Sequence, residues 1–222
     1  MFSLMLAPAS FDLKAIFGNF TKRWYYYLAL FIALILIAVY SLTIRKKRAN
    51  LDKTRKLVYT AIFSALAFIA NYFTIKVSDA LQLSLVATVG FFAGYTLGGG
   101  LGFVASFMGD LICGIVAPLG AYSPIIGLGS GLWGFVPGVL FTAFDKKEYV
   151  LAIISFVLCF FLNSFIVNTL GLTLMYGMSF ESLLLLLPYK LIGVVVNAIV
   201  CILLMPVIDR ILPKDKFPFA KG

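Results

Sequence analysis

The sequence predicts an all-α integral membrane protein, in which a bundle of six transmembrane helices follows one extra N-terminal transmembrane helix. Three observations predict this fold class. Apolar residues make up 62% of the 222 residues and charged residues only 12%, whereas soluble domains have about 45–50% and about 25%. The mean hydropathy is +1.05. Seven apolar segments also approach the ~20 residues that a helix needs to cross a bilayer. These values exclude a soluble globular enzyme.

The first apolar segment, Trp24–Ile44, opens with a run of aromatic residues that is typical of a membrane interface. It is longer than the apolar region of a signal peptide, and no small-residue cleavage site follows it, so we predict a retained anchor. Residues 1–23 before it are expected to be a tail or an interfacial segment. A basic hinge follows the anchor, with seven Lys and Arg residues between 45 and 56. The helix and the start of this hinge form a second region, 24–50.

Six further apolar segments predict a six-helix membrane domain over residues 51–210, followed by a tail at 211–222. The second and third of these segments are short and are joined by Gly98–Gly100. We interpret this glycine run as a turn rather than a phosphate-binding loop, because no GxxxxGK[ST] motif is present. The predicted segments are Leu57–Ile75, Leu81–Leu97, Leu101–Ala117, Pro124–Phe144, Tyr149–Met175 and Leu184–Ile208.

The distribution of basic residues predicts the orientation. If the basic hinge is cytoplasmic, thirteen of the eighteen Lys and Arg residues fall on the cytoplasmic side and five on the outer side. The positive-inside rule favours this topology, with a cytoplasmic C-terminus. The net charge of +9 is then explained by orientation and by anionic membrane lipids, and it gives no reason to expect a nucleic-acid partner.

Small residues recur at four-residue spacing in two parts of the domain. Gly90, Gly94, Gly98 and Gly102 follow this pattern. Such a spacing makes a smooth helix face, which packs closely within the monomer or forms a surface for a partner or pocket. Ala61 and Ala65 form an AxxxA on the first helix of the domain, with the same two alternatives.

The sequence gives no residues on which to base an enzyme. It has no histidine, and we find no hydrolase, phosphotransfer or metalloprotease motif. The three cysteines lie far apart inside apolar segments and are interpreted as buried thiols. We therefore expect no catalytic residues, no metal and no cofactor, and any energy for transport must come from a partner.

A few polar residues stand out against the apolar segments. Asp110 is the one acidic residue deep in such a segment; it either bonds a neighbouring polar group or carries a function, such as ion coupling. Lys190, near the outer end of the last helix, either reaches the interface or holds an anionic ligand. Further polar candidates are Asn163, Asn168, Tyr176, Tyr122 and Gln82.

Several stretches together resemble the S-components of energy-coupling factor (ECF) vitamin transporters. The resemblance covers about residues 55–208. It rests first on residues 109–114 (GDLICG), 118–124 (PLGAYSP) and 131–134 (GLWG). The later motifs Asn168–Leu172 and Leu187–Ile192 look most like the folate-specific branch.

The resemblance implies a substrate-binding membrane subunit of a prokaryotic plasma-membrane uptake system. Such a subunit captures a vitamin from outside and docks on a scaffold membrane subunit that carries two ATPases. Ala61 and Ala65 match the position at which the family meets the scaffold. In the expected pocket, Lys190 supplies charge and Tyr122 and Tyr176 stack on the ligand. Hydrogen bonds to a pterin-like ring are expected from Asn163, Asn168 and Gln82.

Two departures from the folate branch leave the substrate open. That branch usually has Arg where Lys190 stands, and it tends to have another Arg where this chain has Leu81–Leu85. A lysine supplies charge but not the bidentate fork of arginine. Folate is the leading substrate, and the alternatives are riboflavin, thiamin, pantothenate or a queuosine precursor. Outside this family, the alternatives are an ion-coupled secondary transporter, a lipid-modifying enzyme and a scaffold without a ligand.

Overall fold

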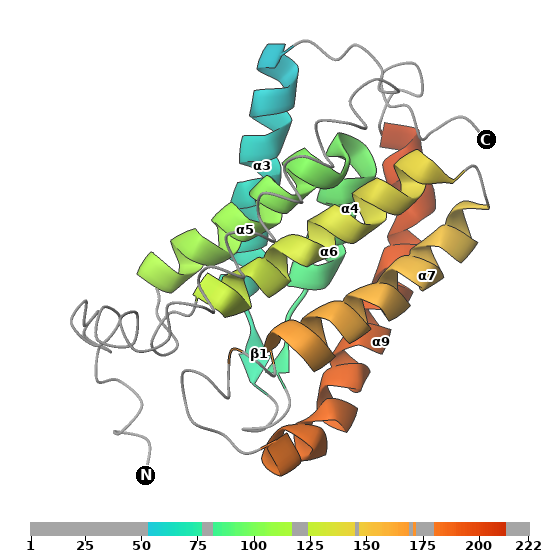
Figure 1. The fold of residues 1–222 in the computed structure, drawn as a ribbon. Helices are drawn as coiled ribbons and strands as arrows, with labels where there is room; N and C mark the ends of the chain where they lie inside the picture. Colours follow the sequence, from blue (N-terminus) through green and yellow to red (C-terminus); the bar gives the residue numbers. More distant parts are fainter. Residues whose placement is uncertain are drawn as a thin grey trace.

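The structure, a computed structural model, describes residues 53–76, 82–116, 124–144, 147–168, 171 and 180–211. In this part of the chain, six helical rods and one short antiparallel hairpin form the bundle shown in Figure 1. The predicted helix at Trp24–Ile44 lies outside the described residues. The elements are α3 (Lys53–Tyr72), β1 (Ile75–Lys76), β2 (Gln82–Leu83), α4 (Val86–Leu97), α5 (Gly99–Val116), α6 (Pro124–Ala143), α7 (Glu148–Cys159), the π-helix η2 (Phe160–Val167) that continues α7, and α9 (Phe180–Ile211).

Glycines bring the backbones of α4, α5 and α6 into direct contact. A Cβ atom on Gly94 would overlap the carbonyl oxygen of Gly134, and one on Gly134 would overlap the carbonyl of Gly102. A Cβ on Gly138 would overlap the backbone nitrogen of Gly99. These glycines are therefore used for close packing within the monomer, the first of the two predicted alternatives.

An aromatic cluster fills the space between these helices and α7. The Phe91 ring of α4 stacks on Phe156 of α7, with centroids 5.5 Å apart, and meets Phe141 of α6 edge-on at 5.8 Å. Trp133 of α6 packs against Phe156 at 5.5 Å. Such pairs contribute about 0.5–1.5 kcal/mol beyond the burial of their area. The cluster fixes α7 against α4 and α6.

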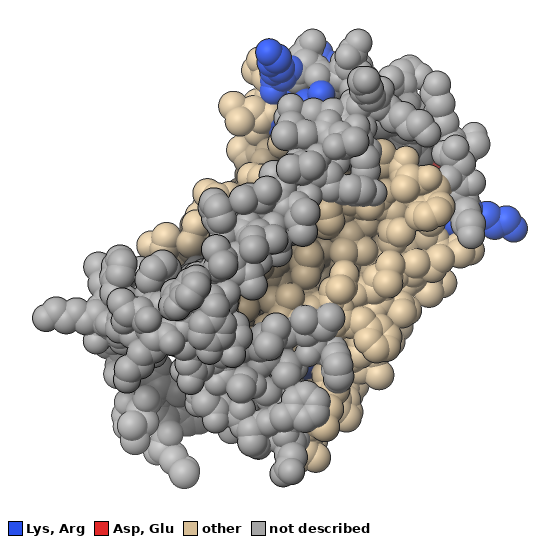
Figure 2. All heavy atoms as spheres, viewed as in Figure 1, with Lys and Arg blue, Asp and Glu red and all other residues tan. Residues whose placement is uncertain are grey.

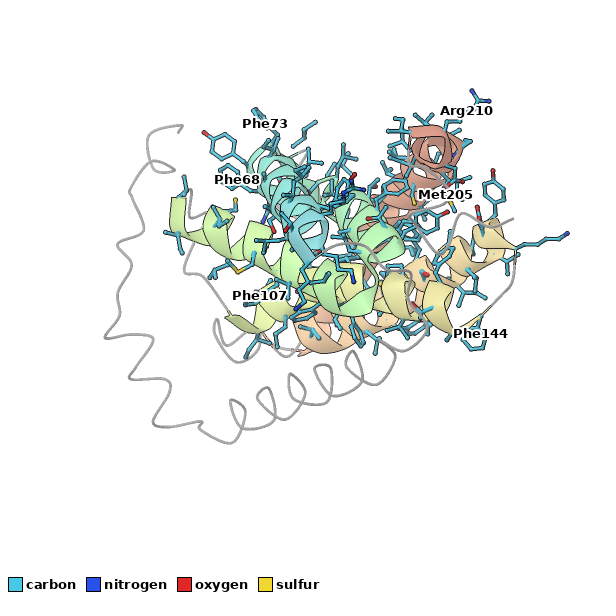
Figure 3. The ribbon with its side chains drawn as sticks, turned by 90° about the horizontal axis from the view of Figure 1, so that it is seen from above. Phe68, Phe73, Phe107, Phe144, Met205 and Arg210 are labelled. Atoms are coloured by element: carbon cyan, nitrogen blue, oxygen red, sulfur yellow. The ribbon has the colours of Figure 1, made fainter. Side chains whose placement is uncertain are left out.

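The two outer helices, α3 and α9, pack along narrow seams. Helix α3 meets α5 where Ala67 contacts Gly109. Helix α9 lies against α4 and α7, and its most buried side chains are Asn197, Cys201 and Met205, spaced four residues apart. Figure 3 shows Met205 on the side of α9 that faces the bundle and Arg210 pointing away from it. The remaining faces of α9 carry exposed apolar side chains, as expected for a helix in contact with lipid.

The two ends of the bundle differ in chemistry. The basic end holds the start of α3, the turn between α6 and α7, and the end of α9, with Lys53, Arg55, Lys147 and Arg210 exposed. The hairpin end holds β1 and β2, the ends of α5 and η2, and the starts of α6 and α9 (Figure 1). Between the ends, the described residues that are visible in Figure 2 are almost entirely uncharged. Among the described residues, three helices are long and apolar enough to cross a membrane: Gly99–Val116, Ile125–Ala143 and Leu184–Ile211.

Two predicted boundaries need correction. The predicted segment Leu81–Leu97 is not helical throughout, because residues 82–83 form β2 and α4 begins only at Val86. The turn after α4 is made by Gly98 alone, whose φ of 79° favours glycine. Gly99 and Gly100 instead belong to the first turn of α5, because a helix can restart directly after a single left-handed residue.

We expect Gly134→Ala to lower the stability of the folded protein by about 1–3 kcal/mol, because the added methyl group meets backbone atoms that cannot rotate away. Thermal unfolding in mild detergent measures the loss. Gly171→Ala is the control, because its Cβ would meet the Ile126 side chain, and it should cost less. Equal melting temperatures for wild type and Gly134→Ala would contradict the proposed backbone contact.

Candidate functional site

Asn163 is the most unusual polar residue at the hairpin end. It lies in η2, a π-helix that continues α7, and π-helical segments are frequent at functional sites. Its side chain is 8% exposed, and its Oδ1 atom accepts no hydrogen bond from the described residues. The absence of a Cβ on Gly129 of α6 makes room for this oxygen. A buried amide oxygen without a donor is costly, and a ligand N–H group would satisfy it.

Lys190 lies in the half of α9 that is nearer the hairpin end. Its side chain is half-buried, and no hydrogen bond or ion pair joins its ammonium group to another described residue. Helix α9 packs against η2, and η2 packs against α6. The cation and the unsatisfied amide of Asn163 thus stand on adjacent elements at the same end of the bundle. A ligand with an anionic group and a hydrogen-bonding ring would complement these two groups chemically.

The other predicted ligand residues are placed only in part. Asn168 is half-buried at the end of η2, and its backbone N–H donates to the carbonyl of Asn163. Gln82 lies in β2 and pairs with Lys76, but its side chain is outside the described part of the chain. Tyr122 and Tyr176 are also outside the described residues. The structure therefore brings Asn163 and Asn168 together at the hairpin end, with Lys190 on the neighbouring α9.

Asp110 accepts a hydrogen bond from a neighbouring polar side chain, which is the first of the two alternatives predicted for it. The Asn71 side-chain amide at the end of α3 donates to the Asp110 carboxylate at 2.8 Å. This bond joins α3 to α5 near the hairpin end. Within the described residues, no group of three or more His, Cys, Asp or Glu side chains is arranged to hold a metal ion.

Sequence reasoning missed two features of this end of the bundle. Gly129 leaves the space that Asn163 occupies. Asn197 of α9 forms a buried hydrogen-bond network with Thr88 and Ser84, beside the hairpin. An amide within an otherwise apolar helix is a signal that could have identified Asn197, because such a group must find a partner.

Ala61 and Ala65 lie side by side on the face of α3 that turns away from the bundle. Both are exposed, whereas Thr60 and Ala67 on the opposite face are buried. Large exposed apolar residues surround the two alanines: Leu57, Val58, Ile62, Leu66 and Ile69. Packing within the described bundle therefore does not account for the AxxxA, and the two alanines form a shallow strip on an apolar surface.

Comparison with known proteins identifies related families and folds. A family model described as "ECF-type riboflavin transporter, S component" matches residues 50–213. A search of curated protein sequences finds no match. A solved structure of the S component of a bacterial ECF transporter has a TM-score of 0.57 and 19% identity, covering 72% of this chain and 98% of its own. The structure of FolT bound with folic acid has the same TM-score and identity, covering 68% and 91%. These likenesses confirm the predicted six-helix fold.

Proposed function

The chain belongs to the family of ECF-type riboflavin transporter S components, and we propose that it binds a vitamin as the substrate-specific subunit of an ATP-driven uptake transporter. Members of this family are membrane-integral components of transporters rather than enzymes. The observation that carries the proposal is the buried Oδ1 atom of Asn163, which has no donor among the described residues. A vitamin bound at the hairpin end supplies that donor.

Folate is the substrate that the charge of the site favours. Its glutamate carboxylates complement the half-buried Lys190, and its pterin ring offers N–H groups to an amide oxygen. FolT, one of the two similar structures, is bound with folic acid, whereas the matching family model carries the name of riboflavin. Riboflavin also has a ring edge that an amide can recognise, but it has no carboxylate to use the cation. The experiment must therefore distinguish binding of folate from binding of riboflavin.

The orientation follows from the two chemically different ends. The basic end, with the exposed Lys53, Arg55 and Lys147, is assigned to the cytoplasm by the positive-inside rule, together with the C-terminus. The hairpin end then faces outward and receives the vitamin. The ATPases are partners, and the scaffold membrane subunit docks on the exposed strip of α3 around Ala61 and Ala65. Small residues at this spacing let a partner helix approach closely.

Ligand identification tests this proposal directly. The protein is purified in mild detergent and denatured, and the released small molecules are analysed by mass spectrometry. Folic acid, riboflavin, thiamin and biotin are then titrated while the intrinsic Trp fluorescence is followed. A near-stoichiometric vitamin that binds with nanomolar affinity supports the proposal and names the substrate. Absence of release and of binding would overturn it.

We expect Lys190→Ala to weaken the binding of folic acid about tenfold or more, because hydrogen bonds to charged groups are among the stronger ones. Lys190→Arg keeps the charge and should retain most of the affinity. Both dissociation constants come from the same fluorescence titration. If Lys190→Ala binds folic acid as tightly as the wild type, Lys190 has no role in holding the anionic group. If only riboflavin binds, folate is the wrong substrate.

Gly129→Ala should weaken vitamin binding although it substitutes none of the residues that are proposed to contact the ligand. The added methyl group occupies the space of the Asn163 amide oxygen and displaces it. We expect Asn163→Ala to reduce affinity as well. In the Asn163→Ala background, Gly129→Ala should have little further effect, and a double-mutant cycle measures this coupling. Additive losses would show that the two residues act separately.

The docking surface is tested by Ala61→Leu combined with Ala65→Leu. The larger side chains block close helix approach, so we expect loss of co-purification with the scaffold subunit and loss of vitamin uptake in cells. Vitamin affinity of the isolated protein should stay the same. Ala143→Leu, at an exposed alanine of α6, is the matched control. Normal uptake by the double variant would place the docking surface elsewhere.

A further inference from the structure

The amide of Asn197 lies in the middle of α9 and is bonded mainly to groups outside that helix. Its Oδ1 atom accepts hydrogen bonds from the Thr88 backbone N–H at 3.1 Å and from the Thr88 hydroxyl at 2.8 Å. Its Nδ2 atom donates to the Ser84 carbonyl and to the Gly193 carbonyl, each at 2.8 Å. Asn197 and Thr88 are each 4% exposed. A single buried side chain thus joins α9 to the start of α4 and to Ser84, the residue that follows β2.

Asn197 also serves as the cap of α4, supplied from another helix. The first N–H groups of a helix have no partner within it, and in an apolar environment each unsatisfied group is costly. The N-cap residue of α4 is Leu85, whose side chain cannot accept a hydrogen bond. Ser84 Oγ instead accepts from Val86 N–H at 3.3 Å, and Asn197 accepts from Thr88 N–H. The same Ser84 hydroxyl donates to the Ala70 carbonyl of α3 at 2.9 Å.

Asn197 and Lys190 lie on the same side of α9. They are seven residues apart, which is about two helical turns or ~10 Å along the axis. The buried seam of α9 runs from Met205 through Cys201 to Asn197, and its continuation toward the hairpin end reaches Lys190. Beyond Asn197 this half of the helix is sparsely packed, since Leu191 is 46% and Leu185 74% exposed.

We propose that the hydrogen bonds between Asn197 and Thr88, here called the α4–α9 clamp, position Lys190 for the ligand. The inference rests on the proposed function in that Lys190 binds the vitamin. Apolar contacts along one narrow seam leave α9 free to rotate and slide, because they have no preferred direction. Three hydrogen bonds join the Asn197 amide to groups outside α9, and together they fix both the rotation of α9 and its position along its axis. Asn197 and Thr88 are positioning residues, and neither contacts the ligand.

Thr88→Val removes the hydroxyl while keeping the size and the backbone N–H, so it weakens the clamp without removing the cap. We expect a loss of vitamin affinity of about three- to tenfold, in the range measured for interhelical hydrogen bonds. Thr88→Ser restores the hydroxyl and should restore affinity. Thr96→Val is the matched control, because the Thr96 hydroxyl, also buried in α4, bonds only to its own helix. Asn197→Ala removes the whole clamp and should give the larger loss.

A double-mutant cycle separates positioning from general stability. If the clamp acts through Lys190, Thr88→Val should have little effect on affinity in a Lys190→Ala background. A merely structural clamp would lower the melting temperature and leave the dissociation constant of the folded protein unchanged. That result, or an equal loss of affinity in both backgrounds, would overturn the proposal.

A measurement without vitamin keeps the test independent of the proposed function. Spin labels are placed at Leu185→Cys on α9 and Ile115→Cys on α5, which are 74% and 64% exposed. The three native cysteines are each at most 4% exposed and should stay unlabelled. Pulsed electron resonance should give a narrow distance distribution in the wild type, a broader one in Thr88→Val and Asn197→Ala, and a narrow one again in Thr88→Ser.

The two kinds of failure can then be told apart. If no vitamin binds to the wild type but the distances respond as expected, the proposed function fails and the clamp still holds the Lys190 half of α9. If the distances in Thr88→Val and Asn197→Ala match the wild type, the clamp does not position α9, whatever the protein binds.

Discussion

Direct contact between the backbones of α4, α5 and α6 is the constraint on which the other packing in this bundle depends. Gly94, Gly102 and Gly134 allow it because a Cβ atom at any of them would overlap a neighbouring backbone. In a bilayer, helices gain little from hiding apolar surface and associate instead through close van der Waals contact. With the three central helices this close, the ring of Phe91 reaches both α6 and α7. Helices α3 and α9 then pack on the outside of the central helices, each through a narrow strip of buried residues.

Most buried polar side chains inside this apolar framework have a hydrogen-bond partner among the described residues. The hydroxyls of Thr96 and Ser155 each bond a carbonyl one turn earlier in their own helix, and Asn197 satisfies its amide across helices. Two buried atoms of the described residues, Ser106 Oγ in α5 and Asn163 Oδ1 in η2, have no hydrogen-bond partner there. Of the two, only Asn163 lies at the hairpin end, on the element beside Lys190. Because each unsatisfied group in such an interior is costly, the Asn163 oxygen is the observation on which the proposed ligand site rests.

Much of the fold could be predicted because the signals are local. Apolar length located the six helices, and glycine spacing identified the faces that pack together. The start of α4 could not be predicted, because Leu81, Leu83 and Leu85 extend the apolar segment before it. At the start of α4, Ser84 bonds to Ala70 and Thr88 bonds to Asn197, and these partners are 14 and 109 residues away in the sequence. The role of Asn197 could not be predicted for the same reason, because its partners Thr88 and Ser84 are far from it in the sequence.

The candidate site was predicted where a polar residue interrupts an apolar segment. That reasoning identified Asn163 and Lys190, which the structure places on neighbouring elements. It could not identify Gly129, because nothing in the sequence reveals which side chain fills the space above a glycine. The ligand-binding roles of Asn163 and Lys190 stay predictions, and so do those of Tyr122 and Tyr176, which lie outside the described residues.

The π-helix has a geometric consequence for the two asparagines of η2. In a regular α-helix, residues five apart point about 140° away from one another, so Asn163 and Asn168 would serve different surfaces. In η2 the Asn168 N–H bonds to the Asn163 carbonyl, which is the i to i+5 spacing of a wider turn. That turn brings position 168 back nearly above position 163. One extra residue per turn therefore converts a spacing that would separate two amides into a spacing that aligns them.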